Sequence, residues 1–115
     1  MENIEEIIKI AIAALEDIKA VDITVIETAD KTPLFSHLII ASGESSRKVK
    51  ALASNVEEEW KKAGVEILGT EGLDQGEWAL VDSGDVVVHV MLPEMREFYD
   101  IETLWKGEHL SRNAD

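Results

Sequence analysis

The sequence predicts a single α/β (or α+β) domain with a mixed sheet of about five strands and two long helices on one face of the sheet. Two stretches with apolar residues at helical spacing, residues 3–19 and 47–63, alternate with short segments rich in β-branched residues. A chain of 115 residues can bury one hydrophobic core of this kind but not two. We therefore expect one domain over residues 1–106, followed by a polar tail over residues 107–115.

The two long helices have recognisable boundaries. Asn3 is a suitable N-cap for the first helix, and Glu6 completes an approximate capping box. The apolar stripe of this helix consists of Ile4, Ile7, Ile8, Ala11, Leu15 and Ile18. The second helix follows the turn over residues 42–46, whose last two serines can cap it, and we expect it to end at Gly64.

The shorter elements lie between and after these helices. Strands are predicted over residues 22–28, 35–42 and 65–69, with loops over residues 29–34 and 70–76. The continuous apolar run in residues 35–42 indicates a central, buried strand. Near the end of the chain, Pro93 suits the first turn of a short helix, and residues 101–106 predict another.

The stretch from Glu77 to Met91, EWALVDSGDVVVHVM, predicts a β-hairpin with a tight turn at Ser83 and Gly84. If Asp82 and Asp85 face each other, alternation divides the side chains between two faces. One face would carry small aliphatic side chains suited to lying under helices: Ala79, Val81, Val86, Val88 and Val90. The other would carry a mixture of large apolar, acidic and histidine side chains: Trp78, Leu80, Asp82, Asp85, Val87, His89 and Met91.

That mixed face is typical of a surface that binds a partner, with the apolar side chains as anchors and the polar ones as further contacts. The alternative is that helices cover both faces of the sheet. In that case Trp78 would lie in a second core, with the polar groups at its margin. The sequence leaves both interpretations open.

The net charge of −13, from 11 cationic and 24 acidic side chains, narrows the class of partner. Nucleic-acid binding depends largely on cations that neutralise phosphates, so we expect no direct nucleic-acid binding. An acidic surface instead favours a basic partner, such as a ribosomal protein, unless the charge serves only solubility.

The composition also indicates a cellular compartment. No apolar run approaches the length of about 18 residues that a membrane-spanning helix needs. The first residues are acidic, which is unlike a secretory signal, and the chain has no Cys. We therefore expect a cytoplasmic protein that does not interact with a membrane.

The turn from Ser42 to Arg47 superficially resembles the phosphate-binding turn of nucleotidyltransferases. That chemistry also needs strand carboxylates that hold divalent metal ions, and the next predicted strand offers only Glu66. Asp82 and Asp85 flank a turn, where acidic side chains most often bond backbone N–H groups. A nucleotide-binding or nucleotidyl-transferring enzyme that uses residues 42–47 is therefore the alternative function, with half of its site present.

A metal site is a weaker hypothesis. His37, His89 and His109 are the only histidines, and they are far apart in the sequence. His37 and His89 could lie on adjacent strands near Asp82 or Asp85, but a single histidine on a strand is more often a hydrogen-bonded partner than a ligand. We expect no metal, no cofactor and no catalytic residue.

A distinctive pattern is carried by residues 40–51, Glu71-Gly72-Leu73, residues 78–93, Arg96-Glu97-Phe98-Tyr99-Asp100 and Leu104-Trp105. The combination of GDVVVHVMLP with REFYD is long, and the pattern extends over about residues 4–106. In these segments the chain resembles the ribosomal silencing factor (RsfS, Iojap or DUF143) family.

The resemblance implies a small α/β domain similar to nucleotidyltransferases but without their active site. Members of the family bind the large ribosomal subunit through ribosomal protein L-fourteen and sterically block joining of the small subunit, which lowers translation when nutrients are scarce. Many members form homodimers. The resemblance places the contact surface at Trp78 and Leu80, and the hairpin's histidine and aspartate at His89 and Asp85.

The chain departs from the family pattern at two places. Ser36-His37-Leu38 stands where the family commonly has Asp-Tyr-Phe, and Asp82-Ser83-Gly84-Asp85 stands where it commonly has Asp-Tyr-Gly-Asp. The absence of tyrosines at positions 37 and 83 is expected to change the surface around the turn and the affinity for the partner. It is not expected to change the fold.

Overall fold

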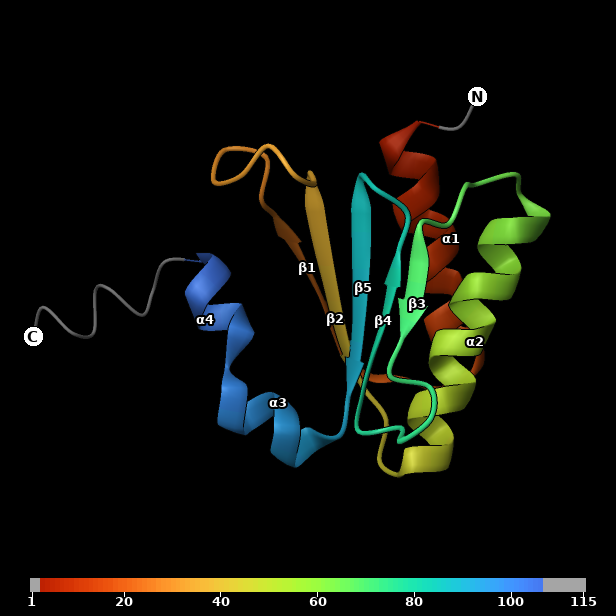
Figure 1. Ribbon diagram of the computed structural model, residues 1–115, viewed down its shortest axis with the longest axis vertical. Coiled ribbons are helices and arrows are strands. Elements are labelled where there is room, and N and C mark those ends of the chain that lie inside the picture. Colours follow the sequence, from red (N-terminus) through yellow and green to blue (C-terminus); the bar gives the residue numbers. More distant parts are fainter. Residues whose placement is uncertain (1–2, 107–115) are drawn as a thin grey trace, which may run out of the picture.

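The computed structural model describes residues 3–106, which form a five-stranded sheet with two long helices on one face and two short helices on the other (Figure 1). The elements in chain order are α1 (Ile4–Asp17), β1 (Val21–Glu27), β2 (His37–Ser42), α2 (Ser46–Lys62), β3 (Gly69–Glu71), β4 (Trp78–Asp82), β5 (Val86–Met91), α3 (Pro93–Tyr99) and α4 (Ile101–Lys106). The predicted polar tail and His109 lie outside the described residues.

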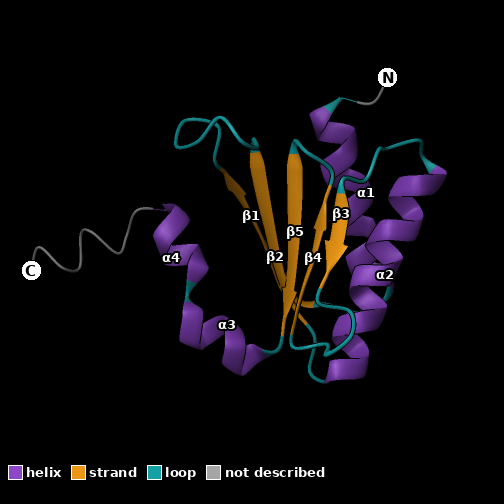
Figure 2. Ribbon diagram, viewed as in Figure 1, coloured by secondary structure: helices purple, strands orange, loops and turns teal. Residues whose placement is uncertain are grey.

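The sheet has the strand order β1-β2-β5-β4-β3 (Figure 2). β2 and β5 are parallel, and all other neighbours are antiparallel, so the predicted mixed sheet is confirmed. The predicted buried position of β2 is confirmed as well, because residues 38–42 are all buried. Leu38 and Ile40 of β2, with Val87 and Met91 of β5, are buried on the face of the sheet opposite α1 and α2.

The helix boundaries follow the expected caps. Asn3 Oδ1 accepts a hydrogen bond from the backbone N–H of Glu6 at 2.8 Å, and Ser45 Oγ accepts one from Lys48 at 3.1 Å. Gly64, just after α2, has a φ of +83°, which favours glycine. The sequence left Ser45 and Ser46 as equal candidates for the cap, and the structure selects Ser45.

The prediction of a strand over residues 65–69 is wrong except at Gly69, where β3 begins. The backbone N–H of Val65 still bonds the carbonyl of Trp60 at 2.9 Å, because the chain is completing the end of α2 there. Pairing with β4 begins only at Leu68, whose N–H donates to the carbonyl of Asp82 at 2.7 Å. The strand β3 therefore extends into residues 70–71, which were predicted as loop.

The main core lies between the sheet and the pair α1–α2. It includes the small aliphatic residues of the hairpin that were predicted to lie under helices, Ala79, Val81, Val86, Val88 and Val90. Trp60 is fully buried, and its indole N–H donates to the carbonyl of Ile7 at 3.0 Å, which joins α2 to α1. The C-terminal helices α3 and α4 lie on the opposite face of the sheet, which we call the second face.

Candidate functional site

The hairpin forms as predicted, but its register differs. Asp82 pairs with Val87 rather than Asp85, and Gly84 and Asp85 form the turn. Gly84 takes a φ of +97° at the first central position, which is typical of type II′ hairpin turns. Ser83 closes the turn through its backbone N–H and hydroxyl, which both donate to the carbonyl of Val86. The partner of Asp82 is thus two residues later than predicted. Because this shift in register is an even number of residues, the predicted division of side chains between the two faces is unchanged.

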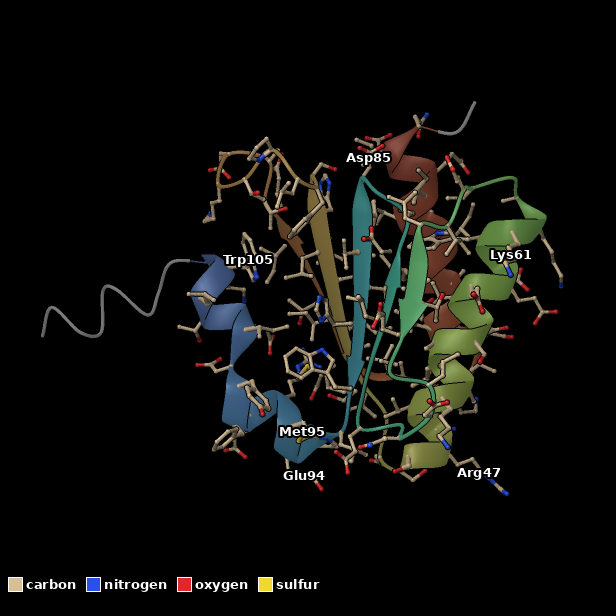
Figure 3. The ribbon with its side chains drawn as sticks, viewed as in Figure 1. Arg47, Lys61, Asp85, Glu94, Met95 and Trp105 are labelled. Atoms are coloured by element: carbon tan, nitrogen blue, oxygen red, sulfur yellow. The ribbon has the colours of Figure 1, made fainter. Side chains whose placement is uncertain are left out.

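The second face holds a small core of its own. Its buried members are Ile26, Leu38, Ile40, Val87 and Met91, and its half-buried members are Phe35, Trp78, Leu80, Met95, Ile101 and Trp105. Figure 3 shows Trp105 on the side of α4 that faces the sheet and Met95 on α3. Helices therefore cover one part of this face, as the second interpretation predicted, and the other part stays open.

Two of the predicted contact residues are not available at the surface. Met91 has no exposed area, and Val87 is only 8% exposed. α3 and α4 pack against the half of the face that Met91 occupies, because β5 leads directly into α3. We therefore correct the predicted set: Met91 supports the site from below and cannot contact a partner.

Trp78 is held by contacts on two sides. Its indole N–H donates to Nδ1 of His89 at 2.9 Å, and its ring centroid lies 5.0 Å from that of Tyr99 on α3. Trp78 stays half-buried, so it is not enclosed in the monomer. The rigid aromatic surface that remains exposed is suited to act as an anchor.

His89 is neutral in this arrangement. Burial lowers its pKa to about 4, although the charge of Asp82 acts in the opposite direction. Because the indole N–H is only a donor, Nδ1 must carry a lone pair, and the ring proton lies on Nε2. His89 therefore orients Trp78 in addition to any contact of its own.

The two aspartates of the hairpin have different roles. Asp82 is half-buried, and its carboxylate accepts from the backbone N–H of Gly84 at 2.8 Å, as expected of a turn former. Asp85 is exposed at the hairpin tip, where Figure 3 labels it. Its carbonyl accepts from the backbone N–H groups of Ser36 and His37. Within residues 3–106, neither carboxylate forms an ion pair.

A hollow of about 490 Å³ opens beside the hairpin turn, and we call it the hairpin hollow. It is lined by Leu34, Phe35, Leu68, Leu80, Asp82, Gly84, Val87, His89 and Trp105. Leu80, Asp82, Val87 and His89 were predicted site residues, whereas Leu34, Phe35, Leu68 and Trp105 were not. The alternation within the hairpin could not identify the latter four, since three other segments of the chain bring them there.

Arg96 fastens the C-terminal helices to the sheet. Its guanidinium bonds both carboxylate oxygens of Glu102 on α4, the hydroxyl of Ser42 on β2 and that of Thr24 on β1. The hydrogen bond from Arg96, together with its charge, lowers the pKa of Glu102. Asp100 takes a left-handed conformation between the two helices, with a φ of +49°.

The structure does not assemble the alternative nucleotide site. Ser42 is buried and accepts a hydrogen bond from Arg96, and Glu66 is exposed outside any strand. In the part of the chain that the structure describes, no three His, Cys, Asp or Glu side chains lie together as a metal site. His37 pairs with Val86, whereas His89 pairs with Ile40 farther along β2, so the two histidines are not neighbours. No helix among the described residues is long and apolar enough to cross a membrane.

Comparison with known proteins now identifies the family. The family model described as ribosomal silencing factor during starvation matches residues 1–115. This chain belongs to the ribosomal silencing factor family. A ribosomal silencing factor RsfS from Chromobacterium violaceum is 58% identical over 106 residues, which cover 92% of this chain and 87% of that protein.

Solved structures agree with the family assignment. A crystal structure of a protein from Chromobacterium violaceum has a TM-score of 0.90 at 57% identity and covers 91% of this chain and 88% of that one. A crystal structure from Bacillus halodurans has a TM-score of 0.80 at 33% identity and covers 88% of this chain and 94% of that one. The resemblance seen in the sequence is thus confirmed. Ribosomal silencing factors are named for a regulatory role rather than for a catalysed reaction.

Proposed function

We propose that the chain binds the large ribosomal subunit through ribosomal protein L-fourteen, sterically blocks joining of the small subunit and so represses translation. It would act in the cytoplasm, without a cofactor and without catalysis. The observation that carries the proposal is the half-open face around Trp78 and Leu80, in a chain that belongs to the ribosomal silencing factor family. Trp78 is already oriented by His89, so little side-chain entropy is lost when a partner covers it.

The charge distribution supports a basic protein as the partner. Residues 64–106 carry ten acidic and two cationic side chains, a net charge of −8, and none of the five strands contains Lys or Arg. Five cations lie on α2 instead, where Figure 3 shows Arg47 pointing away from the sheet. A surface of this sign attracts a basic ribosomal protein and repels exposed RNA phosphates.

The proposed contacts are a subset of those predicted from the sequence. Trp78 and Leu80 would be the apolar anchors, and Asp82, Asp85 and His89 would supply polar contacts. Val87 and Met91 would act as the buried support beneath them. The exposed part of the face is therefore narrower than alternation alone predicts.

Co-sedimentation with isolated large and small subunits tests the proposal. Wild type should sediment with large subunits only, and it should reduce the yield of joined ribosomes when small subunits are added. Trp78→Ala should weaken binding by about 2 kcal/mol or more, the scale of an interface hot spot. Its circular dichroism should stay that of a folded domain. Equal sedimentation of the variant and the wild type would remove Trp78 from the interface.

We also infer that the chain forms a homodimer, as many of its relatives are expected to do. The large exposed apolar side chain of Phe98 on α3 offers surface for a second copy. Light scattering over a range of protein concentrations tests this. If the dimer uses the face around Trp78, large subunits should convert it to monomers on binding.

A further inference from the structure

We propose that the hairpin hollow is a socket for one large apolar side chain of the partner, presented on a segment with a Lys or Arg close beside it. The inference rests on the proposed function, since the partner is the basic ribosomal protein that would contact Trp78 and Leu80. It extends the contact surface beyond Trp78 and Leu80, since Leu34, Phe35, Leu68 and Trp105 also line the hollow and lie outside the predicted contact set.

The lining of the hollow is mostly apolar. Val87, at 8% exposed, lies among its lining residues beside the half-buried Leu80. Phe35 and Trp105 also line it and pack edge to face, with ring centroids 5.2 Å apart. Leu68 completes the lining next to the turn, where its Cδ1 lies 3.4 Å from the position that a Cβ would take at Gly84. The volume of about 490 Å³ lies in the range of roughly 300–1,000 Å³ typical of ligand pockets.

The edge of the hollow is unusually apolar for a surface. Leu34 is 79% exposed and Leu68 is 63% exposed, and they come from different loops. Single exposed leucines are common, but these two come from separate segments and line the same hollow. A partner's side chain in the hollow would remove apolar area of both leucines from water.

The polar groups around the hollow favour a positive charge on the partner segment that carries the apolar side chain. Asp82 lines it, Asp85 follows in the turn, and neither carboxylate has an ion pair among residues 3–106. His89 also lines it, with Nδ1 occupied by Trp78. A cationic side chain next to the apolar anchor would pair with the two carboxylates, whereas an acidic one would be repelled.

Binding of large subunits to a double variant, Leu34→Asp with Leu68→Asp, tests the socket. Both side chains are exposed, so the fold should be retained. The new carboxylates would themselves attract a basic partner, so a loss of binding would report the lost apolar contact. We expect the Kd for large subunits to rise about tenfold or more. The matched control is Leu104→Asp, since Leu104 is 64% exposed and does not line the hollow.

Binding of the double variant at wild-type affinity would overturn the socket, and so would an equal loss in the control. If Trp78→Ala loses binding while the double variant does not, the proposed function stands and the socket fails.

A measurement without ribosomes tests whether the socket exists even if the proposed function fails. N-acetyl-leucyl-lysinamide, added at millimolar concentration, should shift the NMR amide signals of Leu68, Gly84 and His89 in the wild type. The acidic counterpart, N-acetyl-leucyl-glutamic acid α-amide with its side-chain carboxylate free, should shift these signals less. The double variant should show no shift at the hollow residues that it retains. Shifts scattered over other surfaces would contradict the socket. Local shifts in a protein that does not bind subunits would retain the socket and defeat the proposed function.

Discussion

Arg96 on α3 and Glu102 on α4 form a two-point ion pair, with Nε–Oε1 and Nη2–Oε2 distances of 2.8 and 3.0 Å. The Arg96 side chain is only 10% exposed and also reaches Ser42 and Thr24, on two different strands. α3 has no buried residue and α4 has only Thr103, so apolar burial alone secures these helices weakly. The guanidinium therefore connects the C-terminal helices to two strands of the sheet, in addition to the packing of half-buried apolar side chains.

Arg96→Ala should lower the free energy of unfolding by about 2 kcal/mol, because it removes several charge-assisted hydrogen bonds and leaves Glu102 without its partner. Urea denaturation of the variant and the wild type measures the difference. Lys61→Ala is the matched control, since Lys61 is 66% exposed in its ion pair with Glu57 and exposed pairs contribute little. Equal stability of the two variants would show that Arg96 does not fasten the helices.

Stability should depend on pH through His89. Its folded-state pKa of about 4 lies below the ordinary value of 6.5, so between these pH values the unfolded chain binds a proton that the folded chain does not. The free energy of unfolding should therefore fall as the pH falls through this window, by up to roughly 3 kcal/mol. Below about pH 4 this group should add no further change.

NMR titration of the His89 ring and urea denaturation across this window check the prediction together. His89→Asn is the comparison variant, because its amide oxygen can accept from the Trp78 indole but does not titrate. The difference in pH slope between the wild type and this variant isolates His89. A ring that titrates near its ordinary pKa would show that Nδ1 is not held as an acceptor.

Gly84→Ala should destabilise the hairpin by about 1–2 kcal/mol, because a φ of +97° is unfavourable for a residue with a Cβ. Steric conflict contributes little, since the added Cβ would meet only Leu68 Cδ1, at 3.4 Å. Gly69→Ala is the control, because that position has no atom within 4 Å of the added Cβ. Thermal unfolding of both variants separates conformational strain from a general effect of replacing glycine in this sheet.

The sequence predicted those features that depend on neighbouring residues. The cap at Asn3 and the end of α2 at Gly64 were correct, because capping geometry is local. The two faces of the hairpin were also correct, although the turn lies one residue later than expected. Alternation determines the face of each side chain, but it cannot distinguish registers that differ by two residues.

The features that sequence analysis missed depend on distant contacts. Met91 was expected at the surface because its strand position faces away from α1 and α2, and only the packing of α3 and α4 buries it. Leu34 and Leu68 come from loops without periodicity, so no local pattern places them together. The parallel pairing of β2 with β5 brings Leu34 and Phe35 next to the hairpin, and sequence alone does not specify that partner.

The strand order also has a consequence for how the protein is made. β5 occupies the centre of the sheet, yet it is the last of the five strands within residues 3–106 to be synthesised. Until residues 86–91 are available, β1–β2 and β3–β4 are separate antiparallel pairs with no strand to join them. Completion of the sheet must therefore wait until residues 86–91 have been synthesised, and the apolar surfaces of the earlier segments stay unpaired until then.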